Sequence, residues 1–213
     1  DQVSMDAAAA NIDTLDGGPD ADTLILTGTA AGNVVVDLSV AANADQLTTI
    51  NGAAENIVQA NFEHVNAAAM LGGALSITGS TANNAITGTA LADTLGGGDG
   101  QDTIAGGSGA DTITGGLAAD TLSGGAGADR FVFSNASDVT TGEAIDGGAD
   151  IDHLDITANM NLRDATFTAI ENINLSASSL FAQFDWEDIS ALAGGLTVSG
   201  LSTAGSWQKI EIY

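Results

Sequence analysis

A nine-residue period between Gly79 and Val132 constrains the fold of this chain more than any other feature of its sequence. Cut every nine residues, the segment reads GSTANNAIT, GTALADTLG, GGDGQDTIA, GGSGADTIT, GGLAADTLS and GGAGADRFV. The eighth place of each unit is apolar, being Ile86, Leu95, Ile104, Ile113, Leu122 and Phe131. The sixth place is acidic in five units, at Asp93, Asp102, Asp111, Asp120 and Asp129, and is Asn84 in the first. A flexible glycine-rich linker, the alternative interpretation, does not keep apolar residues in fixed phase.

Each unit predicts a glycine turn followed by a short strand. Glycine adopts the positive φ angles that tight turns require, and the triplet at places seven to nine has one inward side chain. Alternating turns and strands would wind into coils that stack at roughly 4.8 Å, so that equivalent aspartates lie above one another. Stacked carboxylates repel, and a hard cation removes that repulsion. Ca²⁺ suits this site best, because it accepts about 6–8 oxygen ligands in flexible geometry.

The pattern G-G-x-G-x-D-x-U-x resembles the calcium-binding nonapeptide of the RTX (repeats-in-toxin) family of secreted bacterial proteins. The resemblance implies an all-β fold, a calcium-stabilised parallel β-roll with two units per coil. It places Asp93, Asp111 and Asp129 on one edge and Asn84, Asp102 and Asp120 on the other, with each ion between neighbours on one edge. Asp111 would then border two ions, and Asp129, at the end of the block, one. The other expected metal-site residues in the block are Asp99, Gly97, Gly98, Gly100, Gly106, Gly107, Gly109, Gly115, Gly116, Gly124, Gly125 and Gly127.

Two isolated units lie outside the block. Residues 17–25 read GGPDADTLI and supply Asp20 and Asp22, and residues 147–155 read GGADIDHLD and supply Asp150 and Asp152. These four aspartates are further candidate calcium ligands. For residues 17–25, an ordinary acidic turn between two strands is the alternative.

The chain is expected to divide into an N-terminal β-solenoid segment (1–78), a central β-roll (79–135) and a C-terminal segment with an aromatic-rich cap (136–213). FEHVN at 62–66 resembles IENIN at 170–174, which favours one continuous solenoid built from two related modules. The segment 181–195 has Phe181, Phe184 and Leu192 spaced for one helical face and ends in two glycines. This pattern predicts a short capping helix over the open end of the roll.

The composition excludes several classes of function. The chain has 3 Lys and Arg against 28 Asp and Glu, a net charge of −25, which rules out a conventional nucleic-acid surface. It has no Cys and therefore neither disulfides nor a thiolate metal site. No apolar run reaches the length of a membrane span, so membrane insertion is not expected. No catalytic motif occurs, and the acids lie in glycine turns rather than in an aromatic cleft, so an enzyme is not expected.

Three functions remain open. The chain is a calcium-folded structural module of a secreted or cell-surface protein of adhesin or S-layer type, a subunit that self-assembles when calcium binds, or the secretion-linked C-terminal part of an exported enzyme or toxin. The expected partners are calcium ions, copies of the chain itself and other surface components. The repeated module and the lack of catalytic residues favour the first.

Overall fold

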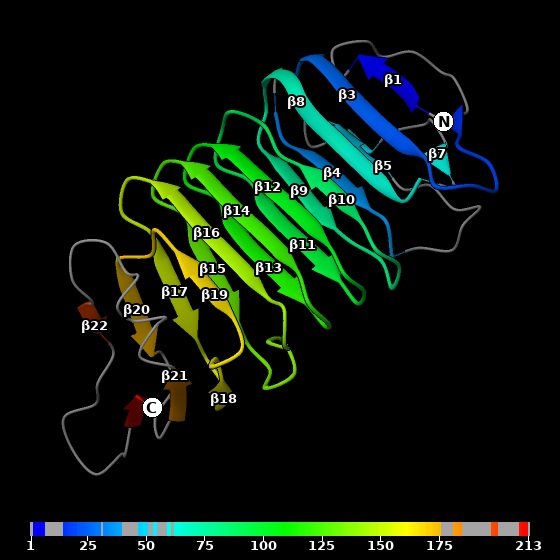
Figure 1. Ribbon diagram of the computed structural model, residues 1–213. Helices are drawn as coiled ribbons and strands as arrows, with labels where there is room; N and C mark the ends of the chain where they lie inside the picture. The colour runs from blue at the N-terminus through cyan, green and yellow to red at the C-terminus, as the bar shows by residue number, and fades with distance from the viewer. Residues whose placement is uncertain are drawn as a thin grey trace.

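The computed structural model describes residues 2–6, 15–30, 32–39, 47–50, 53–54, 59–60, 62–175, 181–184, 197–199 and 209–212. Within these residues the regular structure is entirely β-strand. Figure 1 shows an elongated solenoid in which the chain passes from one end of the molecule to the other in sequence order. No segment in these ranges forms a helix that is long and apolar enough to cross a membrane.

Two large sheets form the body of the solenoid. The first has eight strands in the order β1 (Gln2–Asp6), β3 (Thr23–Thr29), β8 (His64–Gly72), β10 (Ala85–Thr87), β12 (Thr103–Ser108), β14 (Thr121–Ala126), β16 (Ala144–Ala149) and β19 (Thr166–Thr168). The second has ten, in the order β22 (Thr197–Ser199), β20 (Asn172–Leu175), β17 (His153–Ile156), β15 (Arg130–Phe133), β13 (Thr112–Gly116), β11 (Thr94–Gly98), β9 (Leu75–Thr78), β4 (Val34–Asp37), β5 (Leu47–Ile50) and β6 (Ala53–Ala54).

Two small sheets accompany them. One comprises β18 (Met160–Asn161), β21 (Phe181–Phe184) and β23 (Lys209–Ile212), and the other pairs β2 (Leu15–Asp16) with β7 (Gln59–Ala60). Pairing is parallel throughout the described strands except where β5 pairs with β4 and with β6. Parallel pairing of strands this short requires the chain to cross to the opposite sheet between neighbours, which is the geometry of a β-roll.

The register confirms two nonapeptides per coil. In the first sheet Ile86 pairs with Ile104 and Ile104 with Leu122, and in the second Leu95 pairs with Ile113. Strands in the same sheet are therefore 18 residues apart within the block. The spacing rises to 23 residues after Asp120, because residues 134–143 form a longer loop before β16.

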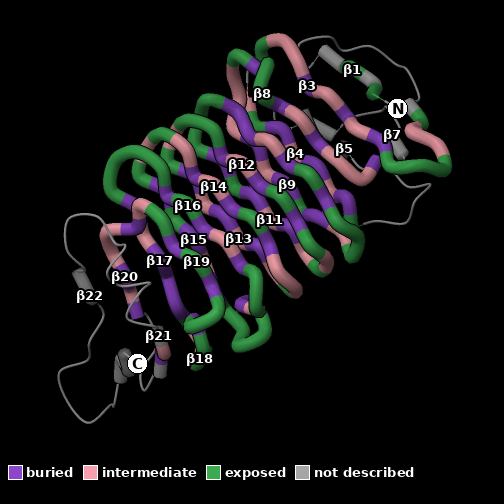
Figure 2. Tube along the Cα trace, viewed as in Figure 1, coloured by how far each residue is buried: buried purple, intermediate pink, exposed green. Residues whose placement is uncertain are grey.

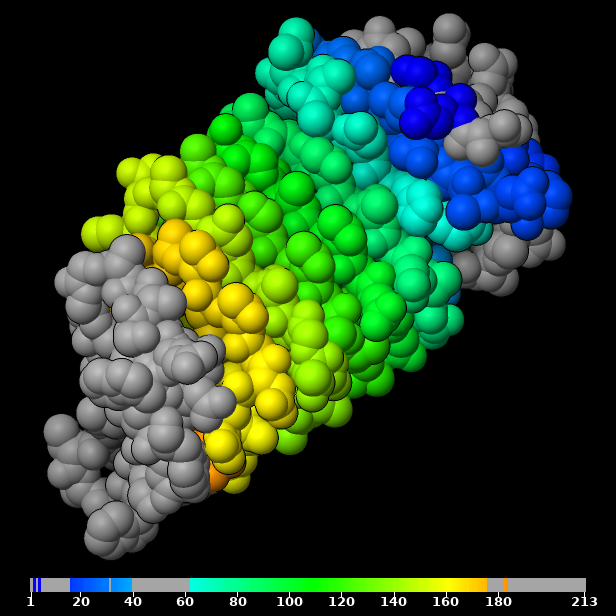
Figure 3. Space-filling view, in the orientation of Figure 1, coloured from blue at the N-terminus to red at the C-terminus, as the bar shows by residue number. Residues whose placement is uncertain are grey.

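The eighth-place residues build the core. Their side chains, from Ile86 to Phe131, are each at most 1% exposed and belong to one apolar cluster that runs along the roll. Figure 2 shows the resulting alternation of buried and exposed positions along the strands, and Figure 3 shows the coils following one another along the long axis. Burial of each Ile or Leu side chain contributes roughly 1.5–3 kcal/mol, so the core stabilises every coil.

The structure corrects two expectations about the chain outside the central block. Phe181–Phe184 is strand β21, paired with β18 and β23, so the helix predicted there is wrong. Two phenylalanines three apart fit a helical face, but pairing on both sides favours the extended form that aromatic residues also prefer. The remainder of the expected helix, 185–195, lies outside the described residues.

The roll also continues past β15, through β16, β17, β19 and β20, rather than ending near residue 135. Both large sheets run across the boundaries expected at 78/79 and 135/136, and the three-part division stays a prediction.

Candidate metal centres

The sixth-place side chains lie in the turns between the two sheets and are buried. Asp93, Asp102, Asp111, Asp120, Asp129 and Asp152 are each at most 3% exposed, as are Asp22 and Asn84. Their burial follows from the turn itself, in which the aspartate folds back over the first glycine of its own unit. An added Cβ at Gly97, Gly106, Gly115 or Gly124 would collide with the Oδ2 atom of the aspartate five residues later. Glycine at the first place is therefore a steric requirement of the buried carboxylate.

On one edge, hydrogen bonds join the aspartates of successive coils into a ladder. The N–H of Asp93 donates to Asp111 Oδ1 at 2.8 Å, and the N–H of Asp111 donates to Asp129 Oδ1 at the same distance. The N–H of Asp129 then donates to Asp152 Oδ1 at 2.7 Å. These contacts place Asp93, Asp111 and Asp129 on one edge, as the RTX resemblance implies. Asp129 does not end that edge, however, because the isolated unit at 147–155 continues it.

The opposite edge carries a second ladder of the same kind. The N–H of Asn84 donates to Asp102 Oδ1 at 2.7 Å, and the N–H of Asp102 donates to Asp120 Oδ1 at 2.8 Å. The expected grouping of Asn84, Asp102 and Asp120 is thus correct. Each ladder bond leaves the other carboxylate oxygen of its aspartate available for a different partner.

Three glutamates that the nonapeptide pattern did not predict also occupy sixth places. Glu143 Oε2 accepts the N–H of Asp120, Glu63 Oε2 accepts that of Asp22, and Glu171 Oε2 accepts that of Asp152. Each glutamate stands two residues before a buried apolar residue of a strand, at Ile145, Val65 and Ile173 respectively. That spacing, E-x-U in place of D-x-U, is the sequence signal that identifies them, and it is present in the FEHVN and IENIN segments.

Several carboxylate oxygens in the ladders are buried and have no hydrogen-bond partner. They are Oδ2 of Asp102, Asp111, Asp120, Asp129 and Asp152, and Oε1 of Glu143. A buried charged oxygen without a partner costs several kcal/mol unless a cation or a proton compensates it. The backbone N–H donors leave these oxygens unpaired, so the ladders favour binding of a cation or a proton beside them.

The atoms around these oxygens fit a calcium ion. Beside Gly97, an added Cβ would contact both Asp102 Oδ2 and the carbonyl oxygen of Gly115 from the next coil. The same convergence occurs beside Gly106 and beside Gly124. No three His, Asp or Glu side chains gather around one point in the described part of the chain, so a site here combines carboxylates with backbone carbonyls. Such an all-oxygen set suits Ca²⁺.

Burial shifts the acidity of the ladder carboxylates. It raises the pKa of Asp102 and Asp111 to about 7, that of Asp120 and Asp152 to about 6, and that of Glu143 to about 8. The pKa values of Asp93 and Asp129 are raised by the same cause. Backbone N–H donors oppose the shift, and neighbouring carboxylates add to it; Asp138, for example, raises the pKa of Glu143. Without a cation, the folded chain therefore holds protons that the unfolded chain would release.

The other predicted residues divide into two groups. Asp20, Asp99 and Asp150 are exposed on their turns and join neither ladder, so their role as ligands stays a prediction. The second-place glycines Gly98, Gly107, Gly116 and Gly125 and the fourth-place glycines Gly100, Gly109 and Gly127 all have positive φ. Ala118, at the fourth place of its unit, shares that conformation with φ 80°.

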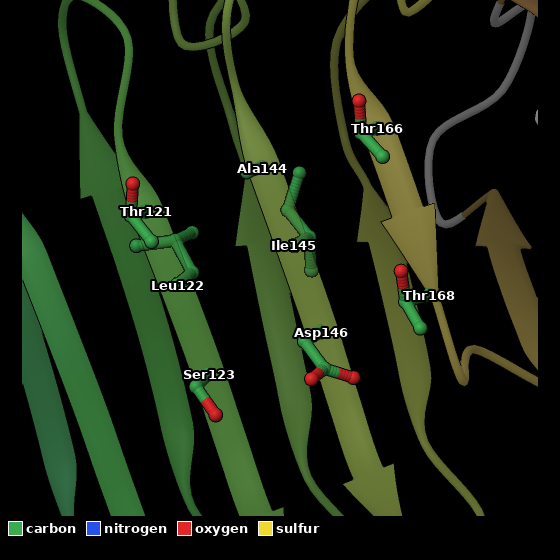
Figure 4. Close-up of a pocket in the computed structure, with 8 residues that line it drawn as sticks. All are labelled: Thr121, Leu122, Ser123, Ala144, Ile145, Asp146, Thr166 and Thr168. Atoms are coloured by element: carbon green, nitrogen blue, oxygen red, sulfur yellow. The ribbon is translucent and has the colours of Figure 1, made fainter.

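A shallow groove lies elsewhere, on the outer surface of β14, β16 and β19. Its lining is Thr121, Leu122, Ser123, Ala144, Ile145, Asp146, Thr166 and Thr168 (Figure 4). Asp146 is the one ionisable group among these eight residues, so the lining offers no acid and base pair for proton transfer.

The fold and the ladders define a parallel β-roll with acidic, oxygen-lined turns. The family model of the RTX calcium-binding nonapeptide repeat matches the chain four times, at residues 9–28, 78–113, 96–131 and 105–139. The chain therefore contains RTX repeats, which indicate a calcium-binding structural module. No curated protein is significantly similar to the chain.

Proposed function

We infer that this chain is a non-catalytic structural module of a secreted or cell-surface bacterial protein, of adhesin or S-layer type, that folds when it meets extracellular calcium. One observation carries the proposal: six buried carboxylate oxygens in two ladders have no partner of their own. RTX proteins are generally secreted, which supports an extracellular setting.

The difference in calcium concentration between the cytosol and the outside of the cell would control folding. If each site has a dissociation constant of roughly 10–100 μM, millimolar calcium outside the cell adds about 1.4–2.7 kcal/mol per site. Several sites together would exceed the margin of stability of a typical domain. Cytosolic calcium is far lower, so the chain would remain unfolded before export and fold afterwards.

The residues that would hold the ions are the ladder aspartates and the carbonyl groups of the turns beside them. Calcium would neutralise Oδ2 atoms that now face low-dielectric surroundings, and the 18-residue register would repeat the site along each edge. The module would then act as a stiff spacer, because each coil is fixed to the next by strand pairing and by shared ions.

Circular dichroism of the full chain tests this proposal. In EDTA at pH 7.5 the spectrum should be that of a largely unfolded chain, and addition of 1–10 mM calcium, a range chosen to exceed the dissociation constants assumed above, should produce a β spectrum. Magnesium at the same concentration is the control, because its smaller ion demands near-octahedral geometry and should act weakly. A chain that is fully β and thermally stable in EDTA at this pH would contradict the proposal.

A further inference from the structure

The turns of the roll are of two kinds, which differ at the second place of the unit. In the unit that begins at Gly88, the second residue is Thr89. Its N–H donates to Asp93 Oδ2 at 2.6 Å, and its Oγ1 lies 3.0 Å from the same oxygen. Asp93 Oδ1 accepts the N–H of Leu75 from the previous coil at 2.7 Å. Both oxygens of Asp93 are therefore occupied by protein donors.

Asn84 is satisfied in the same way. The N–H of Ser80, at the second place of its unit, donates to Asn84 Oδ1 at 2.7 Å. Asn84 Nδ2 donates to the carbonyl oxygen of Glu63 at 2.6 Å, so a neutral amide links this coil to the preceding one. The stacked arrangement is kept here without any charge.

A third turn of this kind follows the glycine block. Continuing the nine-residue frame beyond Val132 puts Ser134 at the second place and Asp138 at the sixth. The N–H groups of Ser134 and Asn135 donate to Asp138 Oδ2 at 2.8 and 2.7 Å. The turns with a hydroxyl residue at the second place thus flank the run of glycine turns on both sides.

Where the second place is glycine, the outcome is different. Gly98, Gly107, Gly116, Gly125 and Gly148 have φ between 101° and 119°. In each of these five units, Oδ2 of the sixth-place aspartate is buried and has no partner. The carboxylate itself has not moved, because an added Cβ at the first-place Gly88 or Gly106 would collide with Oδ2 of Asp93 or Asp111 alike. The residue at the second place therefore decides whether the carboxylate is satisfied by its own turn.

We propose that the second-place residue selects which turns bind calcium. Ser80, Thr89 and Ser134 close their turns with protein donors and exclude the ion, whereas the glycine turns ending at Asp102, Asp111, Asp120, Asp129 and Asp152 require it. This inference rests on the proposed calcium-dependent function and refines it. It removes Asn84 and Asp93 from the ligands expected from the sequence. On the N-terminal side of the glycine block, the coil that contains Ser80 and Thr89 is then closed by hydrogen bonds alone. On the C-terminal side, the closed turn of Ser134 is followed by one more cation-dependent turn, at Asp152.

The decisive experiment compares the calcium content of matched variants of the full chain. Protein dialysed against 0.1–1 mM calcium, about ten times the dissociation constants assumed above, is analysed for bound metal per chain and titrated calorimetrically. Asp93→Asn should bind as many ions as the unchanged protein, and Asp111→Asn should bind at least one fewer. Equal losses from the two variants would overturn the selection rule while leaving the proposed function intact. An unchanged protein that binds no calcium would overturn both.

A variant that should gain a calcium site provides a second test of the same rule. Thr89→Gly removes the hydroxyl and allows the glycine-turn conformation, so Asp93 Oδ2 should become available and the chain should bind one more ion. Ala90→Gly is the matched control, because it adds a glycine to the same turn at an exposed residue and leaves the donors to Asp93 in place. Ala90→Gly should not change the count. An unchanged count in folded Thr89→Gly would overturn the role of Thr89, and if that variant does not fold, the Asp93 and Asp111 pair still decides.

Discussion

Ala118 is the residue whose replacement most directly tests the turn geometry. It occupies the fourth place of its unit, where Gly100, Gly109 and Gly127 have φ of 98°, 111° and 121°. Ala118 is held at φ 80° in the same setting. An L-residue with a Cβ resists this region, whereas glycine enters it freely. We therefore expect Ala118→Gly to stabilise the calcium-loaded protein.

Two opposing contributions determine the size of the effect. Relief of the left-handed conformation contributes roughly 1–2 kcal/mol. Glycine also makes the unfolded chain more flexible, which costs about 0.4–1 kcal/mol. The midpoints of these two ranges give a net gain of about 0.8 kcal/mol, and for a chain of this length that corresponds to a rise of roughly 2–3 °C in the melting temperature.

Thermal unfolding followed by circular dichroism at saturating calcium measures the change. Ala119→Gly is the matched control, because the neighbouring residue is not among those with positive φ. Ala119→Gly makes the unfolded chain more flexible but relieves no left-handed conformation, so its melting temperature should fall by roughly 1–4 °C. If Ala118→Gly lowers the melting temperature as much as Ala119→Gly does, the fourth place does not have the strained geometry described here.

Three further predictions concern the pH dependence of stability, the packing around Gly109 and the role of Glu143. Because the folded pKa of Asp102 and Asp111 is about 7 against an unfolded value near 3.8, the calcium-free fold binds more protons than the unfolded chain between these pH values. Its stability should therefore fall as pH rises from about 4 to about 7, and a pH series in EDTA that shows no gain of β structure on acidification would contradict this. Gly109→Ala should destabilise the protein by more than about 2 kcal/mol in urea unfolding, because its Cβ would collide with the backbone of the neighbouring coil; Gly18→Ala, which has positive φ but open space, should cost only about 1 kcal/mol. Glu143→Gln should weaken calcium binding by calorimetry and stabilise the fold in EDTA, and a loss of stability in both conditions would indicate a purely structural role.

The features that the sequence predicts correctly are those that the nine-residue period determines locally. Apolar residues at every eighth place specify inward side chains, glycines specify turns, and the RTX resemblance supplies two units per coil. From these the parallel roll and the two rows of aspartates follow, and the register of Ile86, Ile104 and Leu122 agrees with them. These features are predictable because each coil repeats the same local conformation and contacts mainly its neighbours.

Other features depend on contacts between residues that are distant in sequence, and a local repeat does not predict them. Glu143 enters the second ladder because a ten-residue loop, 134–143, returns the chain to the register of Asp120, and no local period marks that return. Phe181–Phe184 is a strand because β18 and β23 offer it backbone partners, against a helical spacing of its phenylalanines. The repeat also does not show which carboxylates are hydrogen-bonded by their own turn, since Asp93 and Asp111 have the same place in it. Their difference arises from the N–H and hydroxyl of Thr89, whose direction is set by the backbone of the folded turn.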